Sequence, residues 1–382
     1  MDVVGALRTV AGARSVARGL VAKLVAEGQR KTHEWTPEKQ ALFDAFDASG
    51  VTAATLNADC GGLFEGPRNL AESMLTYETA WVDNGAATSS FVNALAMGPI
   101  AELGTPEQKT RYMTLCAPGN AGGKTWRGSF ALTEPLPYVG VDTGVLCGRV
   151  SVAEWKDGAE PMLRVEKRGR FITNIAIADY VTVAVNSGDD RIKGSCMVIV
   201  EATDPGTFDR GAQTLKCVHQ LSNTGDPVID VVVPASRIIG GYDVVEGRIV
   251  PKLAHSEIIA QVFSKTRVGV GVMGAASLMS AVEPVIRYHG DTASIAELYA
   301  INASVLEKVY PTKTVETDKP IPTFDYQAST YPAPAVKCAK PKVLIPVFPG
   351  TNCEYDTARA VEAAGAQAEI LVIRNLTAED VA

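Results

Sequence analysis

The stretch Ser129-Phe130-Ala131-Leu132-Thr133-Glu134-Pro135 lies where the residue pattern of the chain changes from helical to β-rich. From about residue 125 to about residue 240 the apolar runs are short and β-rich, and turn clusters such as Asn186–Asp190 separate them. Short strands punctuated by Gly, Asp and Pro favour an antiparallel barrel or sandwich over βαβ units. The quoted stretch therefore lies at the start of a predicted β domain.

Helical patterns lie on both sides of this β region. Residues 1–120 are rich in Ala, Leu, Glu and Lys, and apolar residues recur at helical spacing in Leu70–Trp81 and Phe91–Leu103. Thr105–Gln108 has the order of a capping box, with proline in the first turn of the helix. Residues 252–289 return to a helical pattern, which we expect Pro284 to kink or interrupt.

The last part of the chain has a different pattern. Asp291–Tyr310 is helical, and residues 311–341 form a polar, proline-rich connector. Lys342–Phe348 predicts a short apolar strand, and a helix over Tyr355–Ala364 and a strand over Ala368–Ile373 follow. This order is the beginning of a βαβ unit, a fold class that differs from everything before it.

Composition and charge limit the classes of function. The 382 residues suffice for two or three domains, and the net charge of −7 argues against a non-specific nucleic-acid binder. The seven cysteines include no C-x-x-C pair, and the four histidines lack metal-ligand spacing. No apolar run reaches the ~18 residues of a membrane span. We therefore expect a reduced, cytoplasmic chain without a metal site.

A series of motifs carries a family resemblance over residues 1–289. After the opening stretch come, in chain order, Gly140-Val141-Asp142, Gly169–Asn174, Val231–Arg237 and Ser264-Lys265-Thr266-Arg267. Their order and spacing resemble the acyl-CoA dehydrogenase family. The resemblance implies an FAD cofactor, an acyl-CoA substrate and electron-transfer flavoprotein or a similar acceptor as partner. It also implies α,β-dehydrogenation of the acyl thioester, by removal of an α proton and transfer of a β hydride to the flavin.

The resemblance assigns site residues to two segments and one helix. The cofactor-binding residues that it implies are Phe130, Leu132, Thr133, Phe171, Ile172 and Thr173. It places substrate contacts at Ser264 and Arg267, and Val141 stands where the family usually has a substrate-binding serine. The alternative is that the two threonines are turn and strand residues and that Arg267 is a solvated helix charge.

No catalytic residue is identified. Most members of the family carry the catalytic glutamate in a C-terminal helical bundle, from which this chain departs near Gly290. Others carry it just before the arginine, where this chain has Thr266. Glu257 and Glu283 are weak alternatives, and we expect Glu134 to fix the turn. In the family the bundle also builds the homo-oligomer and holds the FAD pyrophosphate, so the resemblance implies weak FAD binding and an inactive enzyme.

Gly269–Gly274 matches the pattern G-x-G-x-x-G of dinucleotide-binding sites. That fingerprint needs a preceding strand and a surrounding βαβ unit, whereas this segment has helical patterns on both sides. We therefore expect these glycines to allow close helix packing.

Residues 290–382 carry a second resemblance. The stretch Lys340–Asp356 resembles formylglycinamidine ribonucleotide synthase, where its synthetase part meets its glutamine amidotransferase domain. This implies a fragment of a purine-biosynthesis ligase. Cys353 follows the first strand and is not the family's nucleophile by position.

Together these patterns predict a multi-domain α and β protein. The expected domains are an N-terminal helical domain (1–122), a middle antiparallel β barrel or sandwich (123–245), a truncated helical bundle (246–289), a helix and linker (290–341) and a partial α/β amidotransferase domain (342–382). Three hypotheses for the function remain: a truncated acyl-CoA-dehydrogenase-like flavoprotein, a purine-pathway ligase fragment, or a non-functional joined gene fragment.

Overall fold

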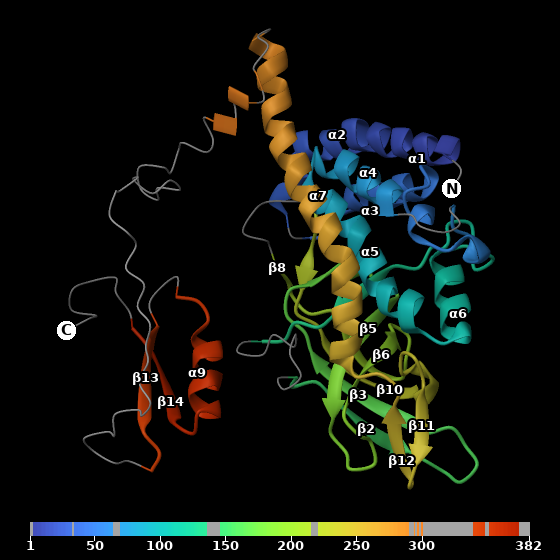
Figure 1. Cartoon of the computed structure of the whole chain (residues 1–382). Helices are drawn as coiled ribbons and strands as arrows, with labels where there is room; N and C mark the ends of the chain where they lie inside the picture. Colours follow the sequence, from blue (N-terminus) through green and yellow to red (C-terminus); the bar gives the residue numbers. More distant parts are fainter. Residues whose placement is uncertain are drawn as a thin grey trace, which may run out of the picture. The chain divides into compact units, whose positions relative to one another are not determined.

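The computed structural model describes two compact units (Figure 1). They comprise Met1–Leu298 and Tyr299–Ala382. The described residues are 3–32, 34–63, 69–135, 146–214, 221–289, 294, 296–297, 299–300, 339–347 and 351–373. Val141, Gly290, most of the expected helix over 291–310 and most of the connector over 311–341 lie outside them.

The first unit begins with a helical layer. Its α-helices are α1 (Val3–Val16), α2 (Ala22–Ala26), α3 (Pro37–Ala48), α4 (Asn69–Ala80), α5 (Asn84–Leu103) and α6 (Pro106–Cys116). A π-helical turn, η1 (Ala17–Val21), joins α1 to α2, and short 3-10 turns lie at η2 (Gln29–Lys31), η3 (Ala53–Thr55) and η4 (Ala58–Cys60). The predicted capping box is confirmed, because Thr105 and Gln108 exchange side-chain and backbone hydrogen bonds at the start of α6.

The β region follows as one large sheet with smaller ones beside it. Its strands are β1 (Gly128–Ala131), β2 (Arg149–Glu154), β3 (Met162–Arg168), β4 (Ile172–Thr173), β5 (Tyr180–Ser187), β6 (Ser195–Glu201), β7 (Gly206–Asp209), β8 (Gln213–Thr214), β9 (Thr224–Gly225), β10 (Val228–Pro234), β11 (Tyr242–Val245) and β12 (Arg248–Pro251). Short 3-10 turns lie at η5 (Ile175–Ile177) and η6 (Ala235–Arg237). The large sheet has the order β1-β5-β2-β3-β10-β7, with β6 paired to β5; β4, β9 and β8 form a second sheet, and β11 pairs with β12.

Strand β5 lies at the centre of this architecture. Its alternate residues enter two different cores: Val181, Val183 and Val185 join the core of the β domain, whereas Tyr180 and Ala184 join the core shared with the helices. The strand is therefore buried on both faces, as its period-2 geometry allows. The sheet is mixed, because β5 runs parallel to β1 and β2 and antiparallel to β6.

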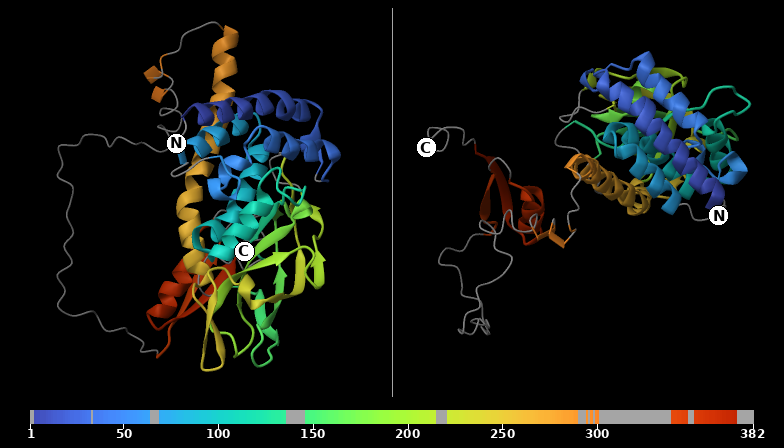
Figure 2. Two further views of the ribbon diagram at one scale, coloured as in Figure 1. Left: turned by 90° about the vertical axis from the view of Figure 1, so that its right-hand side faces the viewer. Right: turned by 90° about the horizontal axis from the view of Figure 1, so that it is seen from above.

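Helix α7 (His255–His289) returns from the β domain to the helical layer and packs against α4 and α5 (Figure 2). It continues past Pro284, so that residue does not interrupt the helix, and the alternative expectation of a kink there stays a prediction. The G-x-G-x-x-G segment lies inside this helix, which contradicts a dinucleotide fingerprint. Of its glycines only Gly269 packs closely, since a Cβ there would lie 2.7 Å from the Phe91 ring; Gly271 and Gly274 have open space.

The second unit contains β13 (Lys342–Val347), α9 (Glu354–Ala363) and β14 (Gln367–Val372). The two strands pair in parallel, which confirms the predicted βαβ order. Leu344, Leu371 and Val372 remain exposed on this small sheet. Across the described parts of both units, no helix combines the length and apolarity required to cross a membrane.

Candidate functional site

The two segments that were expected to contact the flavin lie next to each other. The Ser129 hydroxyl on β1 donates a hydrogen bond of 2.8 Å to the carbonyl oxygen of Thr173 on β4. The Arg170 backbone N–H donates one of 3.0 Å to the carbonyl oxygen of Thr133. Segments about 40 residues apart in the sequence therefore form one continuous edge, which we call the β1–β4 seam (residues 129–133 and 170–173).

The six expected cofactor-binding residues do not share one environment. Phe130, Leu132 and Ile172 are buried in the apolar cores. Thr133 and Thr173 are half-buried, and Phe171 is exposed. Only the last three therefore offer a surface to a ligand. Phe130, Leu132 and Ile172 instead pack in the cores beneath the seam.

Phe171 has an unusual conformation. Its φ is +54°, a left-handed value that is a steric outlier for a bulky residue, and its side chain is 52% exposed. The Asp226 carboxylate accepts a 2.8 Å hydrogen bond from the Phe171 backbone N–H, and the Arg170 guanidinium lies 4.7 Å from the centre of its ring. The local contacts thus hold an aromatic ring at the surface beside Thr173. Such strain concentrates at ligand sites.

Glu134 anchors the chain that follows β1. Its carboxylate accepts hydrogen bonds of 2.7 Å from the backbone N–H groups of Cys147 and Gly148, and it pairs with Lys167 Nζ at 2.6 Å. Both charged side chains are fully buried, and burial lowers the pKa of Lys167. Lys167 also donates to the carbonyl oxygens of Leu132 and Ala184. Glu134 therefore fixes the backbone here, as expected.

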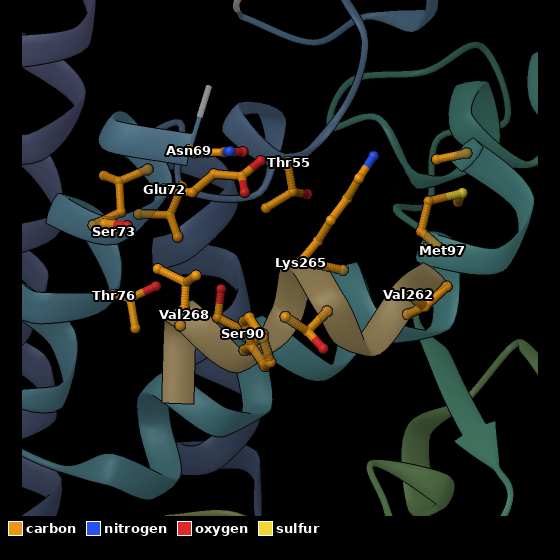
Figure 3. A pocket seen from close by; sticks show the side chains of 18 of the residues that line it. Thr55, Asn69, Glu72, Ser73, Thr76, Ser90, Met97, Val262, Lys265 and Val268 are labelled. Atoms are coloured by element: carbon orange, nitrogen blue, oxygen red, sulfur yellow. The ribbon is translucent and has the colours of Figure 1, made fainter. Parts of the chain in front are cut away.

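A cavity of about 820 Å³ lies between the segment 51–59 and helices α4, α5 and α7 (Figure 3). Ser264, Lys265 and Thr266 line it from α7, and Phe91 and Met97 line it from α5. The predicted substrate contact at Ser264 is thus on the cavity wall. Arg267 is exposed and is not among the described residues that line the cavity, so this structure does not bring it together with Ser264.

Ring packing connects the seam with the cavity wall. The centroids of Phe130 on β1 and Phe263 on α7 lie 6.1 Å apart at 46°. The neighbours of Phe263 along α7, Val262 and Ser264, line the cavity. A ring contact therefore joins the seam to α7, one of the helices that line the cavity, although the sequence places the two in different domains.

The carboxylates considered from sequence do not face this cavity. Glu257 accepts a hydrogen bond of 2.8 Å from the Ala254 backbone N–H at the start of α7, and Glu283 acts electrostatically on Arg14 and Arg18. The lining carboxylates are instead Asp59, Glu72 and Glu102.

Sequence reasoning missed Glu72. Its only sequence signal is its spacing from Thr76 on α4, which puts both residues on one helix face. Glu102 forms an ion pair with Lys265 on the cavity wall.

Comparisons with known proteins agree with this geometry. Residues 9–120 match the family model for the N-terminal domain of acyl-CoA dehydrogenases. Residues 340–382 match the model for the CobB/CobQ-like glutamine amidotransferase domain. None of the curated proteins matches the chain in sequence.

Solved structures resemble the first unit. One, described as the electron transferring flavoprotein of Acidaminococcus fermentans, has 22% identity and a TM-score of 0.60, and covers 77% of this chain and 71% of its own. Butyryl-CoA dehydrogenase from Megasphaera elsdenii has 23% identity and a TM-score of 0.60, with 77% and 70% covered. Glutaryl-CoA dehydrogenase from Mycobacterium smegmatis in complex with FADH2 has 19% identity and a TM-score of 0.58, with 77% and 67% covered.

The comparisons therefore identify a fold and two domain matches. Residues 9–120 match the N-terminal domain of the acyl-CoA dehydrogenase family, and the solved structures show that fold over about three quarters of the chain. Residues 340–382 match a glutamine amidotransferase-like domain, which is consistent with a fragment of formylglycinamidine ribonucleotide synthase.

Proposed function

We propose that the first unit is a flavoprotein that binds FAD along the β1–β4 seam and an acyl-CoA thioester in the cavity between α4, α5 and α7. The observation that carries this proposal is the Phe130–Phe263 contact, which joins the seam to the cavity wall. A flat cofactor at the seam and an acyl group in the cavity would then meet beside α7.

The residues of the seam fit a flavin. Among the described residues, neither the Thr133 nor the Thr173 hydroxyl forms a hydrogen bond with another protein group, so both remain available to the polar edge of a ring. Phe171 offers an exposed aromatic face next to them. When bound, the flavin would accept the β hydride of an acyl thioester.

The residues of the cavity favour binding over rapid dehydrogenation. Removal of an α proton needs a base within hydrogen-bond reach of the substrate, and Thr266 stands at the one described position where part of the family places its glutamate. A hydroxyl is a poor base at neutral pH. The carboxylates that line the cavity, Asp59, Glu72 and Glu102, do not stand at the family's position for the glutamate. We therefore propose that this chain binds its thioester but converts it slowly or not at all.

The test begins with the purified chain and FAD. We expect weak FAD binding, seen as a shift of the flavin absorbance band when the chain is added to FAD, and a further change in that band on addition of butyryl-CoA. Thr173→Val, which removes one hydroxyl at constant shape, should weaken FAD binding about tenfold. Thr110→Val changes an exposed threonine on α6 and should bind FAD as the parent chain does. Absence of any FAD-dependent shift at saturating protein would overturn the proposal, as would equal binding by both variants.

We also propose a partner and a location. Electron-transfer flavoprotein or a similar acceptor would reoxidise the cofactor, which the similarity to the Acidaminococcus structure supports. A reducing, cytoplasmic location agrees with the described cysteines Cys60, Cys116, Cys147, Cys196 and Cys353, all of which are free thiols. A pull-down with an electron-transfer flavoprotein would test the first point, and absence of capture would count against it.

The second unit favours another candidate, a fragment of a purine-pathway amidotransferase. Its described residues supply only the start of an α/β sheet, so we expect no glutaminase activity. A joined gene fragment would explain two such families in one chain. Sequencing one uninterrupted genomic clone across codons 285–295 decides this origin, because a continuous natural reading frame there would exclude an assembly artefact.

A further inference from the structure

Four consecutive residues, Asn223–Asp226, support the β4 side of the seam, and we call them the β9 support. The Asn223 carbonyl oxygen accepts a hydrogen bond of 3.1 Å from the Asn174 backbone N–H, and the Asp226 carboxylate accepts one of 2.8 Å from the Phe171 backbone N–H. Between these two contacts, β9 pairs with β4 in antiparallel register. The backbone from Phe171 to Asn174 therefore rests on the β9 support.

Helix α3 holds the first residue of this support through a buried lysine. Lys39 Nζ donates a hydrogen bond of 3.2 Å to the side-chain oxygen of Asn223, and bonds of 2.7 and 2.8 Å to the carbonyl oxygens of Thr32 and Glu34. Lys39 is 0% exposed and Asn223 is 1% exposed. A buried ammonium is stable only when its protons are bonded, and here three protons meet three oxygens. Lys39 is therefore a fixed link between the helical layer and the β9 support.

This link acts at the end of the short β pairing. Among the described residues, β8 pairs only with Thr224 and Gly225, so Lys39 holds the residue just before that pairing. Asn174, on the other side, is fully buried with a left-handed φ of +63°, and its side-chain amide donates a hydrogen bond of 2.7 Å to the Ser89 carbonyl oxygen on α5. Asn223 and α5 together thus determine the direction in which the chain leaves β4.

We propose that Lys39 is a positioning residue for the flavin, which acts through Asn223 on the placement of Phe171 and Thr173. This inference rests on the proposed FAD binding and adds a residue of the helical layer to the machinery of the seam. Lys39 does not touch the cofactor, and no bond is made or broken. Coupling between two such places typically changes affinity by about 5- to 150-fold, and we expect about tenfold for FAD.

The experiment compares the full chain with its Lys39→Met variant in two measurements. Without FAD, hydrogen exchange at the backbone N–H groups of Phe171 and Asn174 reports their bonds to the β9 support. We expect that exchange to be about tenfold faster in the variant. With FAD, an absorbance titration should give a dissociation constant about tenfold higher. The visible circular dichroism of the bound flavin should change as well, because it reports how the ring is oriented.

Two further variants locate the effect. Asn223→Ala removes the acceptor that Lys39 uses on the β9 support. Because the two residues act in series, the double variant should lose no more FAD affinity than the weaker-binding single variant does. Phe46→Leu is the matched control, since it weakens the buried core around the same helix, α3, outside the link. While folded, it should have the FAD affinity and the flavin dichroism of the parent chain.

The outcomes separate this inference from the function on which it rests. If the parent chain binds no FAD, the proposed function fails and the inference fails with it. If the parent binds FAD and Lys39→Met binds it equally well with the same dichroism, the inference alone is overturned. Additive losses in the double variant, or an equal loss in Phe46→Leu, would also overturn it. If Lys39→Met does not fold, Asn223→Ala takes its place, and unchanged FAD affinity in that variant refutes the link.

Discussion

Two glycines on one helix should respond to the same substitution in opposite ways. Gly269 and Gly271 both lie inside α7, where alanine is favoured over glycine by about 1 kcal/mol. A Cβ at Gly271 would meet nothing within 4 Å. Gly271→Ala should therefore raise the free energy of unfolding by about 1 kcal/mol.

At Gly269 the same gain in helix propensity is opposed by a steric clash. A Cβ there would lie 2.7 Å from Cε2 and 3.1 Å from Cζ of Phe91, so the ring must move. Overpacking of this kind costs about 1–3 kcal/mol. The net effect of Gly269→Ala should be a loss of about 0–2 kcal/mol, which leaves the two alanine variants about 1–3 kcal/mol apart.

Tryptophan fluorescence during urea unfolding measures this difference cleanly. All four tryptophans (Trp35, Trp81, Trp126 and Trp155) belong to the first unit, so the signal is independent of the second. In a Phe91→Leu background the penalty at Gly269 should disappear, since the ring atoms that cause it are absent. If Gly269→Ala stabilises the parent chain as much as Gly271→Ala does, then α7 does not lie against Phe91 and the described cavity wall is wrong.

Three further predictions test other parts of the first unit. Lys167→Met leaves the carboxylate of Glu134 buried without its ion-pair partner. In the same urea assay it should lower the free energy of unfolding by about 3–5 kcal/mol, and a decrease below about 1 kcal/mol would contradict the buried pair. Asparagine tolerates the left-handed backbone, so Phe171→Asn should leave the free energy of unfolding unchanged or raise it by about 1 kcal/mol, and it should weaken FAD binding. Lost stability together with intact FAD binding would contradict our interpretation that Phe171 serves the ligand and not the fold. Burial raises the pKa of Cys116 and of Cys196 to about 12 from an ordinary value near 9. Above pH 9 the unfolded chain therefore releases protons that the native chain retains, so the free energy of unfolding should fall as pH rises. Cys196→Ala should flatten that decline in urea titrations at pH 8–10, and an unchanged slope would contradict the shift.

Local features were predictable from sequence because local chemistry determines them. The capping box at Thr105–Gln108 needs only four consecutive residues. A structural role for Glu134 was expected from its place in the motif of residues 129–135, whereas its partner Lys167 was not, since that contact joins residues 33 apart. The parallel pairing of β1 with β5 was also missed. Strand direction depends on where the connections run, and alternating apolar residues are the same in either direction.

The candidate site was predictable only in part because it depends on helix packing. Thr133 and Thr173 belong to the two segments that the β1–β4 seam brings together, and their contact with a flavin stays a prediction. Arg267 and Thr266 are adjacent in sequence, yet only Thr266 lines the cavity, because consecutive helix residues point about 100° apart. Glu72 was overlooked because nothing near it in sequence shows that α4 faces α7.

Helix α5 shows why the sequence could not tell which residues face the cavity and which face the β domain that carries the seam. One face, with Ser90, Phe91 and Ala94, lines the cavity. The other face supports the β domain: the side-chain oxygen of Asn93 accepts a hydrogen bond from the Gly128 backbone N–H on β1, at 3.1 Å.

The contact between α5 and β1 is close. A Cβ at Gly128 would lie 2.6 Å from the Ala96 side chain, so glycine is required where the helix meets the strand. Apolar and small residues cover α5 all round, a pattern typical of a buried helix, and this pattern does not distinguish the face that lines a cavity from the face that packs on a sheet. One helix therefore supplies residues to both surfaces. This shared support is what the proposed flavin seam and acyl cavity require.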